Sequence, residues 1–318
     1  MARFFQLATL IVLAEFAATC ASTSTTDYPE KLNRRDFIVE AQGGQYSISL
    51  FPKTYSALMS SSFSLILLSP VLVKDDALYN SGSASIIPWF NARGISVWLI
   101  RIKNDVSLEK FGQAILPEIL SSVRKNSGDN DWVMGGISLG GQAAAHYLAD
   151  APQNAKTTGM AFKAAFFLST PFDYNYPGSF GKRLAQANDG EKKNLCNADF
   201  CERFFKGLSE NLIVSKKDIH DSTGKPLWKD LIPSTYLRGK GVRIFFLTGK
   251  IDNVAPSESV YSMFTKTIPK ETENSPEARF LLPGYLNRMS RDFNHADMIA
   301  GEALCDEVLP EILRWIDL

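Results

Sequence analysis

Short apolar runs alternate with longer amphipathic stretches along most of the chain after residue 30. Near-continuous apolar runs, typical of strands buried on both faces of a sheet, lie at 64–69, 95–102, 132–137, 164–169 and 242–248. Residues 36–51 predict one or two opening strands around a Gly43-Gly44 turn, and 279–282 predict one more. Strands that alternate with helices predict an α/β protein with a mainly parallel, doubly wound sheet.

The stretches between these strands predict helices at 85–92, 107–125, 139–150 and 301–316. The clearest is 107–125, where Phe111, Ile115, Ile119 and Val123 recur at every fourth position. That spacing places the four side chains on one helix face, which is expected to pack on the sheet.

One connection is too long for this rhythm. About 70 residues separate the strand at 164–169 from the strand at 242–248, whereas an ordinary connection needs far fewer. We therefore expect an inserted cap or lid at 172–240, with the core formed by 30–171 and 241–318. The aromatic side chains of this segment, beginning with Phe172, suit either an apolar acyl chain or a small core of the cap itself.

The first 20 residues have the layout of a secretory signal peptide. Arg3 is followed by a mostly apolar run from Phe4 to Ala18 and then by small residues. The run is shorter than the roughly 20 residues that span a bilayer. We expect an exported protein, either cleaved and released into the periplasm or medium or tethered to a membrane through a lipid on Cys20. An anchor that stays uncleaved is the other interpretation.

Composition and charge exclude some classes of protein. Hydrophobic residues make up 45% and charged residues 21% of the chain, which excludes a disordered chain. Lys plus Arg and Asp plus Glu both number 34, so the net charge is zero and no nucleic-acid partner is expected. Cys196 and Cys201 could form a disulfide in an oxidising compartment, leaving Cys305 unpaired, or all three could be small buried side chains. No cysteine or histidine spacing predicts a metal site.

The strongest motif is Gly136-Ile137-Ser138-Leu139-Gly140, which matches G-x-S-x-G. It lies between a predicted strand and a predicted helix, as a nucleophile on a sharp strand-to-helix turn requires. Such a turn needs small neighbours and places the serine oxygen near the positive end of the helix. Ser138 is therefore the candidate nucleophile, and an ordinary glycine-rich turn is the alternative.

A serine nucleophile needs a base, and only three histidines are present. His146 follows Ser138 on the same predicted helix by about two turns, too far along to reach back, and His220 lies in the predicted cap. His295 follows the last predicted strand and precedes the final helix. It is the histidine that fits the chain order of serine, acid and then histidine.

The acid and the oxyanion hole are assigned from the loops after strands. Asp252 follows the strand at 242–248, and its rivals are Asp173 and Asp297, of which Asp297 is expected instead to serve as a helix-start or loop residue. One oxyanion N–H is expected from Leu139, the residue after the nucleophile, and another from the loop after 64–69. Pro70 has no N–H, so Val71 is the candidate in that loop.

At this point the chain resembles an α/β-hydrolase over residues 60–318 apart from the cap. It is most similar to the lipase and esterase branch and to polyhydroxyalkanoate synthases, through SLILLSPVLV, LSTPFDY, TGKIDNVAPSESV and the NHADMIAGEALCDEVLPEILRWI terminus. The synthases carry cysteine at the nucleophile turn, where this chain has Ser138. Serine suits hydrolysis, and an export signal fits poorly with an intracellular polymer synthase.

The resemblance implies acyl transfer. Ser138 attacks the carbonyl of a small-molecule or lipid ester, His295 takes its proton, Asp252 orients the imidazole, and Leu139 and Val71 bind the oxyanion. No metal or cofactor is implied. The expected activity is a carboxylester hydrolase. An acyltransferase or peptidase with the same triad and a non-catalytic protein of this fold are the alternatives.

Overall fold

The computed structural model describes residues 32–53, 63–70, 75–80, 85–102, 106–172, 242–252, 254–267, 278–295 and 297–317. Several sequence-based expectations fall outside these ranges and stay predictions. They concern the signal peptide with Cys20, the Cys196–Cys201 pair, the cap beyond Phe172, Asp173, His220 and Val71. Within the described ranges, no helix has the length and apolar character needed to cross a bilayer.

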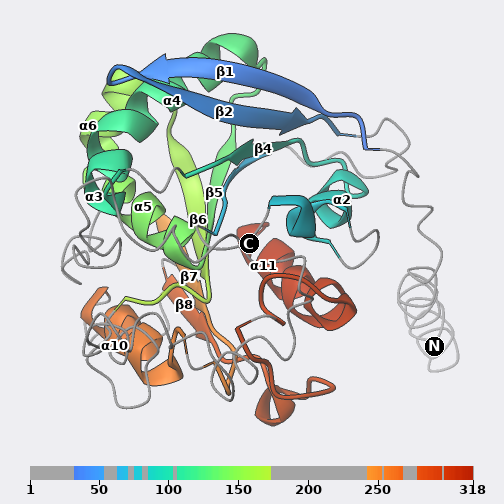
Figure 1. Ribbon diagram of the computed structural model, residues 1–318. Helices are drawn as coiled ribbons and strands as arrows, with labels where there is room; N and C mark the ends of the chain where they lie inside the picture. The colour runs from blue at the N-terminus through green and yellow to red at the C-terminus, as the bar shows by residue number, and fades with distance from the viewer. Residues whose placement is uncertain are drawn as a thin grey trace, which may run out of the picture. The chain divides into compact units, whose positions relative to one another are not determined.

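One sheet organises the described part of the chain (Figure 1). Its eight strands lie in the order β1-β2-β4-β3-β5-β6-β7-β8. Their bounds are β1 Arg35–Ala41, β2 Gly44–Phe51, β3 Ser64–Leu68, β4 Val97–Ile100, β5 Trp132–Ile137, β6 Phe162–Leu168, β7 Arg243–Leu247 and β8 Ala278–Leu281. β2 is antiparallel to β1 and to β4, and all other neighbours are parallel. The predicted mainly parallel sheet is confirmed.

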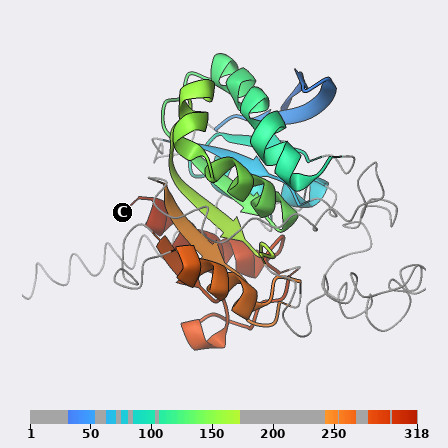
Figure 2. The same cartoon turned by 90° about the vertical axis from the view of Figure 1, so that its left-hand side faces the viewer.

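Helices cover both faces of the sheet, as expected of a doubly wound protein. One face carries α3 (Leu108–Lys110), α4 (Leu116–Asn126), α5 (Leu139–Leu148), α6 (Ala151–Thr158) and α10 (Ser257–Thr267). In Figure 2 the green helices α4 and α5 and the orange helix α10 lie on the side of the sheet that faces the viewer. The other face carries α2 (Ile86–Asn91) and α11 (Leu309–Ile316). Every residue of β3 and β5 is buried, because these central strands are covered on both sides.

Two predicted helices are each interrupted by a π turn before a proline. The turns are η4 (Phe111–Ile115) and η10 (Leu304–Val308), and each is followed by the pentapeptide Leu-Pro-Glu-Ile-Leu, at 116–120 and 309–313. The Leu116 amide donates to the Phe111 carbonyl, five residues back. Proline offers no N–H and its ring clashes with the carbonyl four residues earlier. The wider turn accommodates both effects, so a π turn precedes the α-helix in each predicted helix, and the one at 107–125 also begins with the short α3.

Two helices and one aromatic residue differ from the sequence-based expectations. α6 was not predicted, because it is short and begins beside Pro152, which reads as a break in the pattern, and for α10 only a helix start near Pro256 was expected, without its extent. Phe172 was expected to begin the cap. Instead it is buried and contacts the rings of Phe167 and Phe246, with centroids 5.3 Å and 5.7 Å away. It therefore belongs to the core under α5 and α10.

Candidate active site

The turn that carries Ser138 is tightly packed and strained. Ser138 lies between the last residue of β5 and the first residue of α5, with φ 51° and ψ −127°. A Cβ on Gly136 would come within 2.4 Å of the Gly141 Cα. A Cβ on Gly140 would come within 2.5 Å of the carbonyl oxygens that end β3. The motif therefore needs glycine at both positions because the backbones touch, and the turn holds Ser138 at the carboxyl edge of the sheet.

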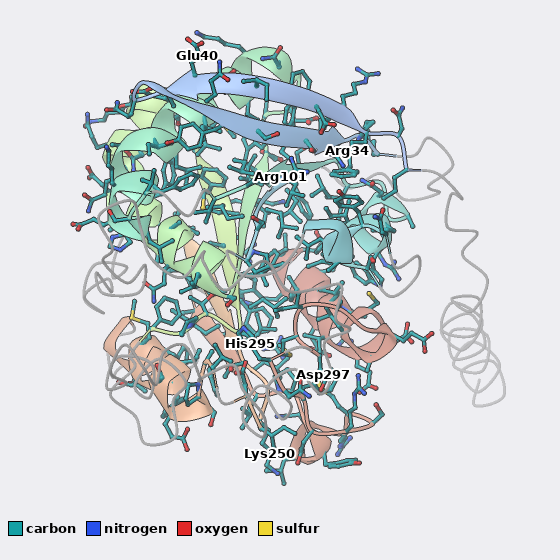
Figure 3. The ribbon with its side chains drawn as sticks, in the orientation of Figure 1. Arg34, Glu40, Arg101, Lys250, His295 and Asp297 are labelled. Atoms are coloured by element: carbon teal, nitrogen blue, oxygen red, sulfur yellow. The ribbon has the colours of Figure 1, made fainter. Side chains whose placement is uncertain are left out.

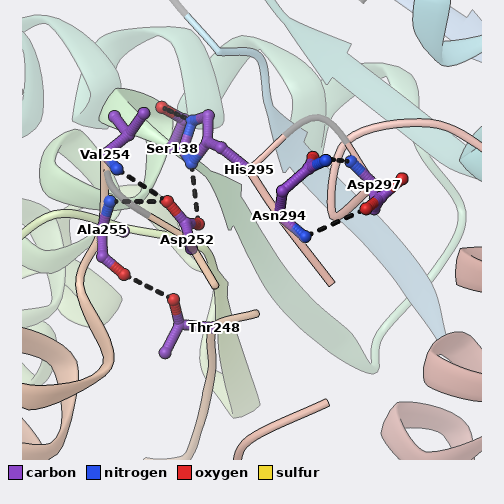
Figure 4. Close-up of polar contacts among 8 residues, drawn as sticks. All are labelled: Ser138, Thr248, Asp252, Val254, Ala255, Asn294, His295 and Asp297. Atoms are coloured by element: carbon purple, nitrogen blue, oxygen red, sulfur yellow. Dashed lines mark hydrogen bonds and ion pairs between the residues drawn. The ribbon is translucent and has the colours of Figure 1, made fainter. Parts of the chain in front are cut away.

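The structure brings Ser138, His295 and Asp252 into one hydrogen-bonded chain (Figure 4). His295 Nε2 lies 3.0 Å from Ser138 Oγ, and His295 Nδ1 lies 2.9 Å from Asp252 Oδ2. An ionised carboxylate only accepts hydrogen bonds, so Nδ1 carries the proton and Nε2 accepts from the serine hydroxyl. That tautomer is the one a general base for Ser138 requires.

All three side chains come from loops at the carboxyl ends of parallel strands. Ser138 follows β5, Asp252 lies in the loop after β7, and His295 lies between β8 and the final helix. In Figure 3 His295 lies at the edge of the sheet toward Lys250, away from Glu40 on β1. Each of the three residues is less than 10% exposed, with values of 8% for Ser138, 4% for Asp252 and 6% for His295. Burial of this kind strengthens the polar interactions among them.

The Asp252 carboxylate is fully supplied with donors. Its Oδ1 accepts the backbone N–H groups of Val254 and Ala255, both at 2.8 Å, while Oδ2 faces His295. The Thr248 hydroxyl donates to the Ala255 carbonyl at 2.6 Å and so fixes the same turn. A buried carboxylate is costly unless it is hydrogen-bonded, and these contacts meet that need. They also leave one oxygen, Oδ2, aimed at the imidazole.

The rival residues have other surroundings. The Asp297 carboxylate accepts the Asn294 N–H and pairs with Arg291, so it braces the loop that holds His295. His146 lies on α5 against η4, where a Cβ on Gly112 would come within 2.6 Å of the His146 Cβ. The acid that the structure places against the His295 imidazole is Asp252, at 2.9 Å.

Half of the expected oxyanion hole lies within the described residues. Leu139 is the first residue of α5, and the first amides of a helix have no partner inside it. After β3, the Ser69 N–H donates to the Ile100 carbonyl at 3.1 Å, and Pro70 has no N–H. Neither residue can therefore donate to an oxyanion. The other candidate, Val71, lies outside the described residues.

No group of three or more His, Cys, Asp or Glu side chains is placed to hold a metal within the described ranges. Cys305 is 1% exposed, and burial raises the pKa of its thiol to about 12. This matches the expectation of a small buried side chain, and a thiol with so high a pKa is a poor nucleophile or ligand.

Sequence reasoning missed four residues that brace this site: Thr248, Val254, Ala255 and Asn294. Val254 and Ala255 act through their backbone amides, which the sequence does not reveal because every residue other than proline has one. The Asn294–Asp297 pair did leave a signal, because Asn-x-x-Asp is a variant of the capping box.

Comparison with known proteins supports the architecture. No protein-family model matches the chain, and no curated protein matches its sequence. Solved structures do match. A thermophilic esterase from Thermogutta terrifontis aligns over 90% of this chain and 100% of its own, with a TM-score of 0.53 and 13% identity. An alpha/beta fold family hydrolase from Bacillus anthracis aligns over 89% and 98%, with a TM-score of 0.52 and 14% identity. The chain has the α/β-hydrolase fold.

A serine hydrolase from Cycloclasticus zankles is similar to the same degree, with a TM-score of 0.51, 12% identity and 90% and 98% of the two chains covered. In the α/β-hydrolase fold the nucleophile occupies a sharp turn between a central strand and a helix. Ser138 occupies that place here, between β5 and α5, with β3 and β6 on either side of β5.

Proposed function

We propose that this protein is a serine hydrolase of carboxylic esters, of the lipase and esterase type, that works through an acyl-enzyme. The observation that carries the proposal is the hydrogen-bonded chain from Ser138 through His295 to Asp252, with contacts of 3.0 Å and 2.9 Å. The fold and the strained serine turn support it, because both are features of hydrolases that use an activated serine.

In the proposed reaction His295 Nε2 takes the Ser138 proton while Oγ attacks the ester carbonyl carbon. The carbonyl oxygen becomes an oxyanion, which the Leu139 N–H and the Val71 N–H are proposed to bind. The intermediate collapses, the carbon–oxygen bond to the alcohol breaks, and the leaving alkoxide takes the proton from His295. Water then attacks the acyl-serine with the same base and releases the carboxylic acid. Asp252 stabilises the imidazolium in both halves.

Serine at position 138 favours hydrolysis over chain growth. Polyhydroxyalkanoate synthases, which the sequence resembles, use cysteine at this turn, and a thiol ester suits a long-lived acyl-enzyme. We propose that water hydrolyses the oxygen ester that forms on Ser138. The same triad in an acyltransferase or a peptidase would pass the acyl group to another acceptor or cleave an amide.

We also propose that the protein is exported and acts outside the cytoplasm. The positive, apolar and then small residues of 1–20 support this proposal. A lipid on Cys20 would tether the enzyme to a membrane surface. Metabolic labelling with a radioactive fatty acid tests the tether, because Cys20→Ala would abolish the label.

The test of the activity is hydrolysis of p-nitrophenyl esters from acetate to palmitate by the wild type, Ser138→Ala and Ser169→Ala. Ser169 is a matched control. It follows β6, the strand next to β5, has φ 49°, and is fully buried with a hydroxyl that has no partner in the part of the chain described. A fluorophosphonate probe reports the nucleophile independently of the ester.

Loss of turnover and of labelling in Ser138→Ala alone would support the esterase, and the preferred chain length would separate esterase from lipase. No turnover and no labelling in the wild type would refute it. Labelling of Ser138 without hydrolysis of any ester would favour the transferase or the peptidase.

A further inference from the structure

We propose that Asp297 is a positioning residue that holds His295 in line with Ser138 and Asp252. The inference rests on the proposed function, because it assigns a task to a carboxylate that the reaction itself does not use. The hydrogen bonds of Asp297 go to the backbone and side chain of Asn294, the residue before the histidine. Asp297 acts on the backbone on either side of the histidine.

The geometry is a reciprocal pair of hydrogen bonds around the histidine, as in a capping box, although residues 297–299 form a turn and not a helix. The Asn294 N–H donates to Asp297 Oδ2 at 3.0 Å, and the Asp297 N–H donates to Asn294 Oδ1 at 3.0 Å (Figure 4). The Met298 N–H also donates to the Asn294 carbonyl at 3.3 Å. Asn294 is thus held at its nitrogen, its carbonyl and its side chain, and His295 is the next residue. In a capping box each side chain satisfies the backbone amide of the other residue.

The two ends of this loop are also fixed. Phe293 and Met298 are fully buried. The Ile251 N–H donates to the Phe293 carbonyl at 3.0 Å, which ties the loop to the one that carries Asp252. A Cβ on Gly249 would come within 2.2 Å of that carbonyl, so the two loops touch. With Phe293 anchored, the capping box fixes the remaining freedom of the backbone at His295.

The hydrogen bonds of Asp297 matter more than its charge. Its ion pair with Arg291 spans 3.1 Å, but the arginine side chain is 46% exposed. Ion pairs with an exposed partner contribute little to stability. The bond from the Asn294 N–H is half of a reciprocal pair, and an aspartate-to-asparagine change keeps an oxygen that can accept it. Misplacing a catalytic group by about 1 Å can reduce the rate by about 100-fold.

The experiment compares Asp297→Ala, Asp297→Asn and Glu311→Ala in the full-length protein. Glu311 is the matched control: its carboxylate is 21% exposed against 15% for Asp297, and it pairs at 3.3 Å with an arginine that is 40% exposed. We expect Asp297→Ala to lose about 10-fold to 100-fold in kcat with KM unchanged, as expected for a misplaced catalytic group. Asp297→Asn and Glu311→Ala should retain wild-type kcat.

A second measurement, by proton NMR, reports the hydrogen bond of His295 without any substrate being turned over. A hydrogen bond from His295 Nδ1 to Asp252 gives a strongly downfield proton resonance, which His295→Ala identifies. That resonance should be lost or broadened in Asp297→Ala and kept in Asp297→Asn. In a His295→Ala background, Asp297→Ala should have no additional effect on residual activity, because the group it positions is gone.

Equal kcat in the wild type and Asp297→Ala would overturn the inference, as would an intact resonance in Asp297→Ala or an equal loss in Glu311→Ala. If the wild type hydrolyses no ester and is not labelled at Ser138, the proposed function fails. The positioning of His295 would still be read from the resonance, so the two failures can be told apart.

Discussion

Replacing Asp252 by asparagine tests the triad most sharply, because the structure dictates which way the new side chain faces. Asp252 Oδ1 accepts two backbone N–H groups at 2.8 Å. An asparagine must keep its carbonyl oxygen there, since an NH₂ group would face two donors. Its NH₂ group therefore replaces Oδ2 and faces His295 Nδ1, 2.9 Å away in the wild type.

An NH₂ donor at that place forces the His295 imidazole into its other tautomer. Nδ1 must become the acceptor, so the proton moves to Nε2 and points at Ser138, which then has no base. A histidine held in the wrong tautomer reduces kcat by about 10⁴-fold in a triad of this kind. That factor corresponds to about 5.4 kcal/mol of activation free energy. The fold should survive, because the two backbone hydrogen bonds to the side-chain oxygen remain.

The assay is p-nitrophenyl ester turnover, with the rate of fluorophosphonate labelling of Ser138 as a second readout. The melting temperature checks the fold, and Asp297→Asn serves as a neutral aspartate-to-asparagine control. The reasoning is refuted if Asp252→Asn keeps more than about a tenth of wild-type kcat, since that loss is under 1.4 kcal/mol. An inactive Asp173→Asn beside an active Asp252→Asn would identify Asp173 as the acid.

Three further predictions concern the scaffold. Gly140→Ala should lower both kcat and the free energy of unfolding, the latter by about 1–3 kcal/mol, because its Cβ meets two backbone oxygens. Gly128→Ala is the control, because nothing lies within 4 Å of its added Cβ, and it should change neither kcat nor the free energy of unfolding measured in urea. Equal losses in Gly128→Ala and Gly140→Ala would contradict the clash. Glu118→Ala loses both exposed hydrogen bonds to the β1–β2 turn and should destabilise the protein by about 0.5–1.5 kcal/mol without changing kcat, whereas a drop in kcat would show that the turn reaches the site. The pKa of the Cys305 thiol is raised to about 12, so it should not react with Ellman's reagent in the native state at pH 8. In the unfolded chain the thiol has a pKa of about 8.5, so the free energy of unfolding should fall as the pH rises above that value toward the native pKa. Cys305→Ala should remove this part of the pH dependence.

The strands, and the meeting of Ser138, His295 and Asp252, could be predicted from the sequence because each depends on one dominant effect. A strand covered on both faces must be apolar over most of its length, and β3 and β5 are predicted from that requirement alone. Ser138 was found from a turn that admits little besides glycine around it. His295 and Asp252 followed from their order after the last strands.

The parts that were missed depend on backbone groups or on competing local effects. The amides of Val254 and Ala255 hold Asp252, and an amide is the same whichever side chain it carries. Pro117 breaks a regular helical pattern, and the hydrophobic spacing does not show whether the helix ends there or widens into a π turn. Asp297 was expected to be a helix-start or loop residue, and the spacing alone did not show that it exchanges hydrogen bonds with Asn294 on the other side of His295.

The contact between Ser138 and His295 joins residues 157 positions apart, whereas His295 and Asp252 are 43 apart. Closing such a long loop costs conformational entropy before any contact repays it, and chains rich in distant contacts fold slowly. Helices such as α5 can form locally, but Ser138 and His295 meet only after β5, β6, β7 and β8 have assembled side by side. Regain of the proposed esterase activity during refolding should therefore lag behind the recovery of helical circular dichroism, so that the activity would report on the last folding step.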